Sequence, residues 1–273
     1  MQYLDLNLRP IKDVDPRDFS IVAMVDSQPR SGNASLPNDF VPHVVIDHHP
    51  IRNNTRKSAF TDIRSRYGAT ATILWEYLEH AGITPEMPVA TALLYGIRSD
   101  TQDLGREATQ ADIDAAEKLH SLANKRILGQ IQRGRVPGDY FQMLVDALRE
   151  AVIYPNAIIA SLGELHNADM LGEAADLFLR HELVGWTMAY GFYKNKALVS
   201  VRTIDGGLRA EDVVKKIISR IGTGGGHATS AGGQVPLKKK TATYRKELEK
   251  KFRDRFLRSI GSDNKKGVRL VKG

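Results

Sequence analysis

Short apolar runs alternate with helical patterns along the first half of the chain. Residues 21–25 and 44–46 are apolar without interruption, which is typical of strands buried on both faces of a sheet. Residues 69–80 carry apolar side chains at helical spacing and are followed by Gly82, while residues 89–97 form a second helical run rich in Ala and Leu. Strands that alternate with helices predict an α/β fold with an open, mostly parallel sheet.

The pattern breaks at residues 133–138, where the sequence Arg-Gly-Arg-Val-Pro-Gly has the turn residues and polarity of a domain boundary. A helix over residues 140–152 is expected to connect the two halves. We therefore predict a first domain, a linker with its connecting helix, a smaller α/β domain that binds substrate, and a basic tail: residues 1–133, 134–152, 153–262 and 263–273.

The second half begins with a strand and a helix, continues with a β-hairpin, and then has a helix that runs into a glycine-rich loop. These elements are predicted over residues 157–162, 169–182, 186–193 with 197–203, and 209–221. From Tyr244 onward the apolar residues recur every four positions, which predicts an amphipathic last helix over residues 241–260. The stripe expected to pack on the second domain is Tyr244, Leu248, Phe252, Phe256 and Ile260.

Composition places the chain among globular proteins. It has 273 residues, of which 42% are hydrophobic and 26% charged, and no apolar run is long enough to cross a bilayer. The first residues have neither the basic nor the apolar region of a signal peptide, so we expect a cytoplasmic protein with no membrane partner. The chain has no cysteine, so any metal must be held by His, Asp and Glu.

The net charge of +7 is concentrated at the C-terminal end. Residues 238–273 hold 14 Lys and Arg against 4 Asp and Glu, whereas the remaining residues hold 25 against 28. This end is either a surface for a polyanion or a solvated helix and tail. On charge alone the solvated helix and tail are favoured.

Three aspartates follow apolar runs. Asp26 follows Ile-Val-Ala-Met-Val, Asp47 follows Val-Val-Ile, and Asp100 closes the sequence Leu-Leu-Tyr-Gly-Ile-Arg-Ser-Asp. In an open parallel sheet the functional groups gather beyond the carboxyl ends of the strands, so at least two of these carboxylates should share one rim. Taken singly, each is more simply an aspartate that begins a turn or caps a helix.

The triplet Asp47-His48-His49 favours a functional site, because the chain has only 8 histidines. Successive residues of a regular strand point in opposite directions, so one metal can be shared by both imidazoles only if the chain turns there. In a turn from strand to loop, one histidine could bind metal and the other a phosphate oxygen. Carboxylates with imidazole and without sulfur suit Mn²⁺, Mg²⁺ or Fe²⁺ better than a structural zinc.

The second candidate feature is the segment Gly222-Thr-Gly-Gly-Gly-His227, which continues to Ala231-Gly-Gly. Glycines allow the backbone to come close to a ligand, and consecutive amides in such a loop bind anions. The segment has neither the Lys-Ser/Thr of a Walker A loop nor the strand that precedes a dinucleotide-binding fingerprint. We therefore predict a phosphate-binding loop that includes His227, with a merely flexible loop as the alternative.

Together, the segments VDSQP, IDHHP, GIRSDT and GGGHATSAGG resemble, in order and spacing, the motifs of the DHH phosphoesterases with a DHH-associated C-terminal domain, over residues 10–260. The superfamily includes RecJ-like exonucleases, oligoribonucleases and cyclic-dinucleotide phosphodiesterases. The resemblance implies that Asp26 bridges two divalent metals, with His48 a ligand of one and Asp100 of the other. It further implies that Asp47 assists the metal site catalytically and that His49 faces the phosphate.

For the second domain the resemblance implies a substrate-binding role for His227, for Gly224, Gly225 and Gly226, and for Arg202 in Ser-Val-Arg-Thr. Arg202 is the weakest of these assignments, since an arginine at the end of a strand is more often an ion-pair partner at the surface.

The family's first motif, a His and two Asp on the first strand, has no counterpart, because no histidine precedes His43. Residues 1–11 resemble the connection between the first and second motifs, so we expect a misassigned start, a shortened product or a natural deletion. We therefore predict weak hydrolysis by this chain alone.

The resemblance implies hydrolysis that depends on a divalent metal, Mn²⁺ or Mg²⁺, acting on short single-stranded nucleic acid or a small nucleotide. The alternative is a non-catalytic remnant that binds nucleotides or nucleic acid. An inorganic pyrophosphatase is less favoured, because its small anion calls for cationic side chains rather than a glycine loop. The sequence leaves open whether the chain forms a homodimer.

Overall fold

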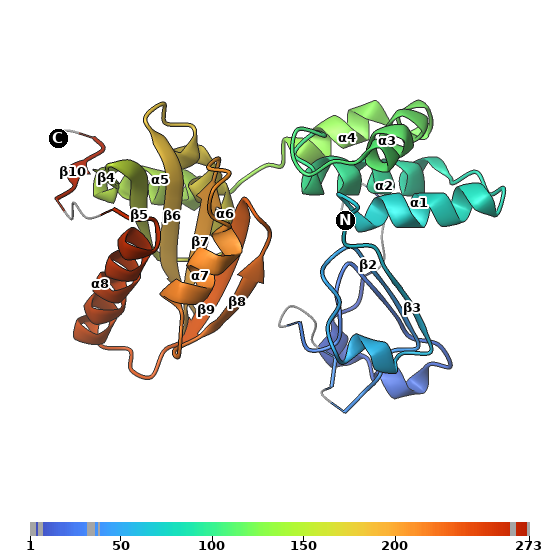
Figure 1. Ribbon diagram of the computed structural model, residues 1–273, viewed down its shortest axis with the longest axis horizontal. Helices are drawn as coiled ribbons and strands as arrows, with labels where there is room; N and C mark the ends of the chain where they lie inside the picture. Colours follow the sequence, from blue (N-terminus) through green and yellow to red (C-terminus); the bar gives the residue numbers. More distant parts are fainter. Residues whose placement is uncertain (1–3, 5–7, 32–35, 38, 263–265, 272–273) are drawn as a thin grey trace. The chain divides into compact units, whose positions relative to one another are not determined.

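The computed structural model describes residue 4 and residues 8–31, 36–37, 39–262 and 266–271 (Figure 1). Two compact units divide between Arg135 and Val136, inside the segment whose turn residues predict a boundary. Parts of the N-terminal stretch 1–11 and of the tail 263–273 lie outside the described residues.

The first unit has a three-stranded parallel sheet in the order β1-β2-β3. The strands are β1 (Ala23–Val25), β2 (Val44–Asp47) and β3 (Phe60–Ile63). Short 3-10 helices flank them: η1 (Ile11–Asp13), η2 (Pro16–Asp18) and η3 (Thr55–Lys57). The expectation that both faces are buried is wrong for β1, where Met24 is buried but Ala23 and Val25 are exposed.

Helices complete the described part of the first unit (Figure 1). They are α1 (Thr70–His80), α2 (Met87–Asp100), α3 (Gln110–Leu122) and α4 (Lys125–Gln132). Their apolar faces form one core around Trp75, Leu94, Ile97 and Leu119. The predicted helices over residues 69–80 and 89–97 correspond to α1 and α2. Helix α1 ends at His80, and Gly82, two residues later, has a φ of +66°, the left-handed conformation that glycine adopts after helix ends.

The second unit is built on a seven-stranded mixed sheet in the order β10-β4-β5-β6-β7-β9-β8. Only β5 and β6 pair in parallel; the other neighbours are antiparallel. The strands are β4 (Val152–Tyr154), β5 (Asn156–Glu164), β6 (Val184–Tyr193), β7 (Lys196–Thr203), β8 (Thr223–Gly226), β9 (Ser230–Pro236) and β10 (Val268–Arg269). The predicted hairpin is β6–β7.

Helices cover both faces of this sheet (Figure 1). They are α5 (Gly138–Glu150), α6 (Met170–Leu179), α7 (Ala210–Ile217) and α8 (Ala242–Ser259). Side chains of α5 and α6 share one core with the sheet, and those of α7 and α8 share the other. The predicted stripe of the last helix is confirmed: Leu248, Phe252 and Phe256 are buried, and Tyr244 and Ile260 pack against the same core.

The predicted glycine-rich loop is a β-hairpin rather than a loop. β8 pairs antiparallel with β9, with Gly224 opposite Gly233 and Gly226 opposite Ala231. A Cβ atom on Gly224 would lie 2.5 Å from the carbonyl oxygen of Gly232. The glycines therefore permit a close approach of two backbones, and only the tip at residues 227–229 is a turn.

The expectation that the residues after Gly261 stay in solvent is also wrong for part of that segment. β10 pairs antiparallel with β4, Val268 opposite Ile153, and the amide of Leu270 donates to the carbonyl of Ala151 at 2.9 Å. Leu270 packs against the core below α5 and α6. Among the helices within the described residues, none has the length and apolar character to cross a bilayer.

Candidate metal site

The ends of β1 and β2 place two carboxylates at one rim of the first sheet. Val25 lies opposite Ile46 in the parallel register, so Asp26 and Asp47 follow side by side. The amide of Asp26 donates to the carbonyl of Ile46 at 3.0 Å, and its φ of +55° turns the chain away from the sheet. The Asp26 side chain remains half exposed at the rim.

Thr70, the first residue of α1, ties this rim to the helix. Its hydroxyl donates to Oδ1 of Asp26 at 2.8 Å and accepts from the amide of His48 at 3.2 Å. Thr70 is buried, so both strand ends are held against the start of one helix. Nothing in the sequence pattern pointed to Thr70.

The His48 ring is buried and fixed in orientation. Its Nδ1 lies 3.2 Å from the carbonyl oxygen of Tyr67, and because a carbonyl only accepts, Nδ1 carries the proton. The neutral ring with this tautomer has its lone pair on Nε2, the atom that lies 3.5 Å from Oδ1 of Asp26. A histidine whose second nitrogen donates to a carbonyl is the usual arrangement of a metal ligand.

Asp47 and His49 form a close pair. The carboxylate of Asp47 is 1% exposed and its Oδ1 accepts from Nδ1 of His49 at 2.8 Å and from the His49 amide at 3.2 Å. Burial by itself raises the pKa of Asp47, but the hydrogen bonds from His49 and Gln28 outweigh it and leave this pKa below its usual value. The same hydrogen bond raises the pKa of His49, against the effect of burial.

Gln28 is a buried side chain that connects several groups behind the rim, and no sequence pattern pointed to it. Its Nε2 donates to Oδ2 of Asp47 at 2.8 Å, and its Oε1 accepts from the Arg52 amide at 2.8 Å and the Thr55 hydroxyl at 2.7 Å. The side chain is 1% exposed. Both oxygens of Asp47 thus already accept hydrogen bonds, so Asp47 is placed to orient the His49 ring.

Asp100 reaches the same rim from the C-terminal end of helix α2 rather than from a strand. Burial and the neighbouring charge of Asp26 raise the pKa of Asp100 to about 6, although His48, His49 and Arg106 act in the opposite direction. A carboxyl held back from ionising by another carboxylate marks a place where a cation would stabilise both charges.

A buried carboxylate behind the rim holds the segment that orients His48. Asp112 accepts from the Gly68 amide at 2.8 Å, from the Thr72 hydroxyl at 2.5 Å, and from the amide of Thr109 at 2.7 Å. Burial raises the pKa of Asp112, but these hydrogen bonds dominate and lower it. Helix α3 thereby fixes the residue next to Tyr67, whose carbonyl contacts His48.

The residues of this rim fit a divalent cation. Ligand atoms of Asp26, Asp47, His48 and His49 all lie within 4.8 Å of one another. The set combines carboxylate oxygen with imidazole nitrogen, which suits Mn²⁺ or Mg²⁺. The predicted rim residues are therefore brought together in the first unit, with Asp100 beside them. The turn after β2 lets His48 and His49 approach each other, with ring centroids 4.4 Å apart.

The remaining predicted residues belong to the second unit. Arg202 lies on β7, where its Nε donates to Oδ1 of Asp176 at 2.8 Å and its Nη1 donates to the Ser200 hydroxyl at 2.8 Å. Its side chain is 17% exposed. Arg202 is thus an ion-pair partner of α6, which is the alternative stated for it above.

Main-chain groups at the tip of the glycine hairpin form hydrogen bonds with other backbone groups of the second unit. The His227 amide donates to the Ser230 carbonyl at 2.7 Å, and the carbonyl of Ala228 accepts from the Ala210 amide at 2.6 Å. The His227 carbonyl accepts from the Glu211 amide at 3.3 Å. The tip therefore caps the first turn of α7, and these two amides of α7 are not directed at a ligand. Gly224, Gly225 and Gly226 lie in the edge strand β8.

Comparisons with known proteins agree with this architecture. Residues 155–254 match the family model of the DHHA1 domain. An uncharacterized protein of Methanocaldococcus jannaschii is 33% identical over 260 residues, which cover 94% of this chain and 52% of the relative. The chain thus spans about half the length of this curated relative.

Two solved structures are also similar. An exopolyphosphatase-related protein from Bacteroides fragilis has a TM-score of 0.58 at 13% identity, over 78% of this chain and 64% of that one. RecJ from Thermus thermophilus, solved in complex with Mn²⁺, has a TM-score of 0.46 at 15% identity, over 84% of this chain and 44% of that one. The first of these likenesses shows a shared fold.

Proposed function

We propose that this chain, whose second unit matches the DHHA1 domain and whose first unit carries the Asp-His-His triplet, is a phosphoesterase of the DHH family that hydrolyses phosphate esters with a divalent metal. The substrates we propose are short oligonucleotides or small nucleotides, and the metal Mn²⁺ or Mg²⁺. The observation that carries the proposal is the pair of Asp26 and His48, whose Oδ1 and Nε2 lie 3.5 Å apart.

Asp26 and His48 would hold the cation, with Asp100 completing the set of carboxylates around it. When bound, such a cation supplies Lewis-acid activation of the phosphate ester and of the attacking water. The fixed ring of His48 and the hydroxyl of Thr70 hold these ligands in position in advance. Preorganised ligands reduce the entropy lost on binding.

His49 is suited to contact the substrate phosphate. Its raised pKa keeps the imidazole protonated over a wider pH range, and an imidazolium donates hydrogen bonds from both nitrogens. Nδ1 is directed at Asp47, and Nε2–H is the group that we propose to donate to a phosphate oxygen. Asp47, held by Gln28, orients this donor.

In the second unit we propose that the glycine hairpin, with Gly224, Gly225, Gly226 and His227, contributes to substrate binding. The edge strand β8 exposes Gly224 and Gly226, so a substrate can approach its backbone closely. Arg202 is the least favoured of the proposed substrate contacts, because its guanidinium is already paired with Asp176.

A second candidate function, nucleotide binding without hydrolysis, is favoured by one observation. Both oxygens of Asp47 already accept hydrogen bonds from Gln28 and His49, which leaves few carboxylate oxygens in the described residues for a two-metal site. Metal binding and hydrolysis must therefore be measured separately.

The test is Mn²⁺ binding by calorimetry together with hydrolysis of a short RNA and of a mononucleotide ester. Asp26→Asn and His48→Gln should abolish both metal binding and hydrolysis, whereas Asp114→Asn, an exposed carboxylate on α3, should change neither. Hydrolysis that persists unchanged in both site variants would refute the proposal. Metal and nucleotide binding without hydrolysis would support the second candidate.

A further inference from the structure

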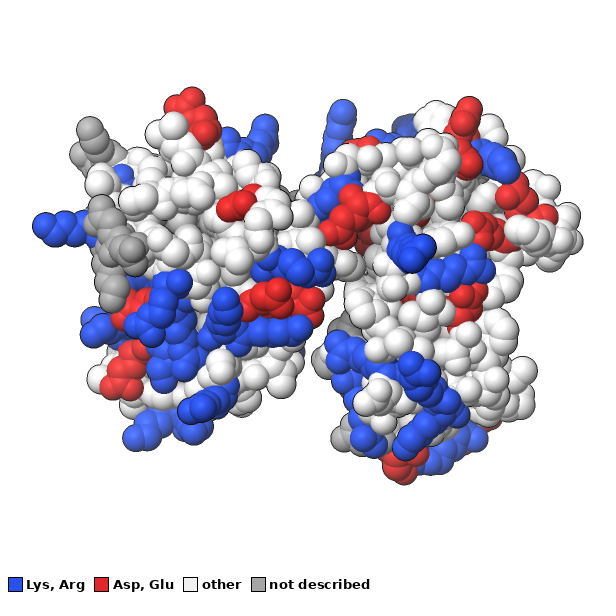
Figure 2. All heavy atoms as spheres, in the orientation of Figure 1, with Lys and Arg blue, Asp and Glu red and all other residues white. Residues whose placement is uncertain are grey.

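A basic groove lies between the C-terminal ends of α7 and α8, on the face of the second unit opposite to α5 and α6. Its volume is about 660 Å³. Five cationic side chains line it together with two serines, and none of the lining residues is acidic: Lys215, Lys216, Ser219, Arg220, Arg255, Arg258 and Ser259. Figure 2 shows Lys and Arg side chains gathered over these two helices.

Two of these cations have structural partners. Arg255 donates to the carbonyls of Ile217 and Ser219 at 2.7 and 2.9 Å, so it caps the end of α7, and Lys215 pairs with Glu211. Within the described part of the chain, no ion pair is found for Lys216, Arg220 or Arg258. All three are exposed. These three exposed charges line one groove and have no ion-pair partner among the described residues, which favours an anion as the occupant.

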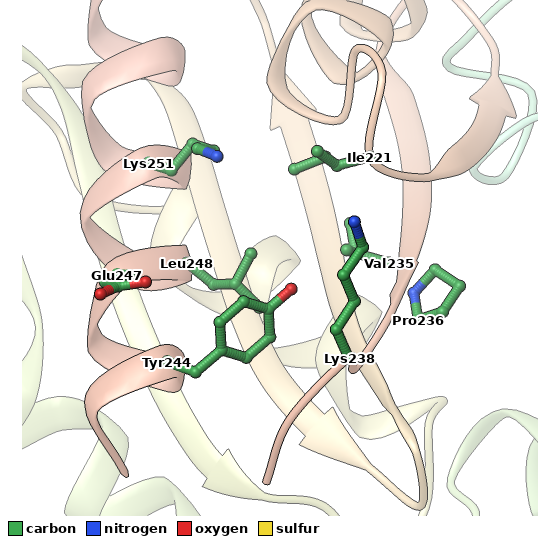
Figure 3. A pocket seen from close by; sticks show the side chains of 8 residues that line it. All are labelled: Ile221, Val235, Pro236, Lys238, Tyr244, Glu247, Leu248 and Lys251. Atoms are coloured by element: carbon green, nitrogen blue, oxygen red, sulfur yellow. The ribbon is translucent and has the colours of Figure 1, made fainter. Parts of the chain in front are cut away.

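A smaller hollow of about 170 Å³ lies between α8 and the end of β9. Its walls are the apolar side chains of Ile221, Val235 and Leu248 and the ring of Tyr244 (Figure 3). Lys238 and Lys251 stand at its edge with one carboxylate, Glu247. An apolar hollow with an aromatic wall and cations at the rim suits a planar ring that carries a phosphate.

The groove and the hollow share one side of α8. Lys251 lines the hollow and Arg255 lines the groove; four residues apart, they project from the same helix face about 6 Å along the axis. On the facing wall, Arg220 of the groove directly precedes Ile221 of the hollow. A strand with one base in the hollow would therefore lead its phosphates into the groove.

We propose that this surface of α7 and α8 binds single-stranded nucleic acid, with a base against Tyr244 and the phosphate backbone along Lys216, Arg220 and Arg258. Aromatic stacking combined with a cationic track is how proteins bind single strands without reading sequence. The second unit carries 23 Lys and Arg against 15 Asp and Glu, so its overall charge attracts a polyanion. The inference goes beyond the proposed hydrolysis and does not depend on the metal site.

The charge part is tested by anisotropy of a labelled single-stranded oligonucleotide of about ten nucleotides, with the intact chain in EDTA so that hydrolysis is absent. Lys216→Glu with Arg258→Glu should weaken binding about tenfold or more and flatten the salt dependence by about one to two units of slope. Lys246→Glu with Lys250→Glu changes the net charge equally on another side of α8 and should alter binding by less than about twofold. Equal losses in both variants would overturn the proposal.

The base part is tested with Tyr244. Tyr244→Phe keeps the ring and should bind as the wild type does, whereas Tyr244→Ala should lose about tenfold, because stacking of one base is lost. Glu247→Gln removes the only acidic group at the rim and should strengthen binding. An abasic strand should bind wild type and Tyr244→Ala alike.

Tyr244→Ala binding as tightly as the wild type would refute the base site. Inorganic polyphosphate, which has no bases, should compete weakly. The comparison is made with unlabelled oligonucleotide at the same concentration of phosphate groups. If polyphosphate displaced the labelled oligonucleotide equally well, the surface would be a polyphosphate site and the assignment to nucleic acid would be wrong.

Discussion

Nδ1 of His48 lies 3.2 Å from the carbonyl oxygen of Tyr67, and this contact sets which ring nitrogen faces Asp26. The next residue, Gly68, donates its amide to the buried carboxylate of Asp112 at 2.8 Å. The start of α3 therefore positions a histidine at the rim of the sheet, although the helix itself contributes no side chain to that rim.

Gly68→Ala should weaken metal binding through this path. An added Cβ would lie 2.7 Å from Cγ2 of Thr101 and 2.9 Å from Oδ2 of Asp112, so the segment with the Tyr67 carbonyl must shift. We expect a loss of metal affinity of about tenfold or more, typical when a ligand's supporting group is disturbed, and lower thermal stability. Gly129→Ala, where a Cβ meets nothing within 4 Å, should be neutral or slightly stabilising. Unchanged metal affinity in Gly68→Ala would contradict this path.

Asp100→Asn should stabilise the metal-free protein at neutral and alkaline pH. The folded-state pKa of Asp100 is about 6, above its usual 3.8, so the metal-free fold loses stability as pH rises between these values, and the loss persists above them. Two pKa units correspond to at most about 3 kcal/mol, less for a group that water still reaches.

The measurement is thermal unfolding in EDTA at about pH 4 and about pH 8. The melting temperature of Asp100→Asn should exceed that of the wild type only at the higher pH, and Mn²⁺ should raise it less than it raises the wild type. Asp114→Asn serves as the exposed control. A variant less stable than the wild type at the higher pH would show that Asp100 is satisfied without a cation.

Gln28→Met should destabilise the first unit by about 2–4 kcal/mol, because the Arg52 amide, the Thr55 hydroxyl and one oxygen of Asp47 would each lose a buried partner. Methionine has a similar length, so little volume is lost. Gln110→Met, at an exposed position on α3, is the matched control. If both variants had the same midpoint of denaturant unfolding, the buried hydrogen bonds of Gln28 would not stabilise the first unit as described.

Removing residues 266–273 should lower the stability of the second unit and promote self-association. The deletion takes away β10 and the contact of Leu270 with the core, so β4 becomes an exposed edge strand, which favours pairing between molecules. Removing residues 272–273 alone leaves β10 in place and should have neither effect. Light scattering and thermal unfolding measure both. A shortened chain that stayed monomeric and equally stable would show that β10 contributes nothing to the sheet.

The sequence predicted the elements whose apolar periodicity was long and regular. Helices α1, α2, α6, α7 and α8 and the hairpin β6–β7 all fall where their patterns placed them. The triplet at residues 47–49 was found because such a run of residue types is rare. Its surroundings were not found, since Gln28, Thr70 and Asp112 act through contacts between residues 19 to 44 positions apart, which no local pattern encodes.

Two expectations failed for a common physical reason. A loop was predicted at residues 223–226 because glycines permit unusual backbone angles and a close approach to a ligand, yet here they let two glycine-rich backbones pair closely where side chains are absent. Residues 268–270 were expected in solvent because of the charges around them. Instead, Val268 pairs with the edge strand β4 and Leu270 packs against the core. In both cases tertiary pairing overrides local preference.

The hairpin of β8 and β9 has a consequence for how this protein tolerates genetic change. At Gly222, Gly224 and Gly226 any side chain would place its Cβ 2.2 to 2.5 Å from a carbonyl oxygen of the facing strand, so even alanine is a severe substitution. In a saturation mutagenesis library these codons should be nearly intolerant, while Gly225, where a Cβ meets nothing within 4 Å, should accept small residues. Intolerance at Gly222, Gly224 and Gly226 together with tolerance at Gly225 would indicate that backbone pairing, rather than ligand contact, requires these glycines.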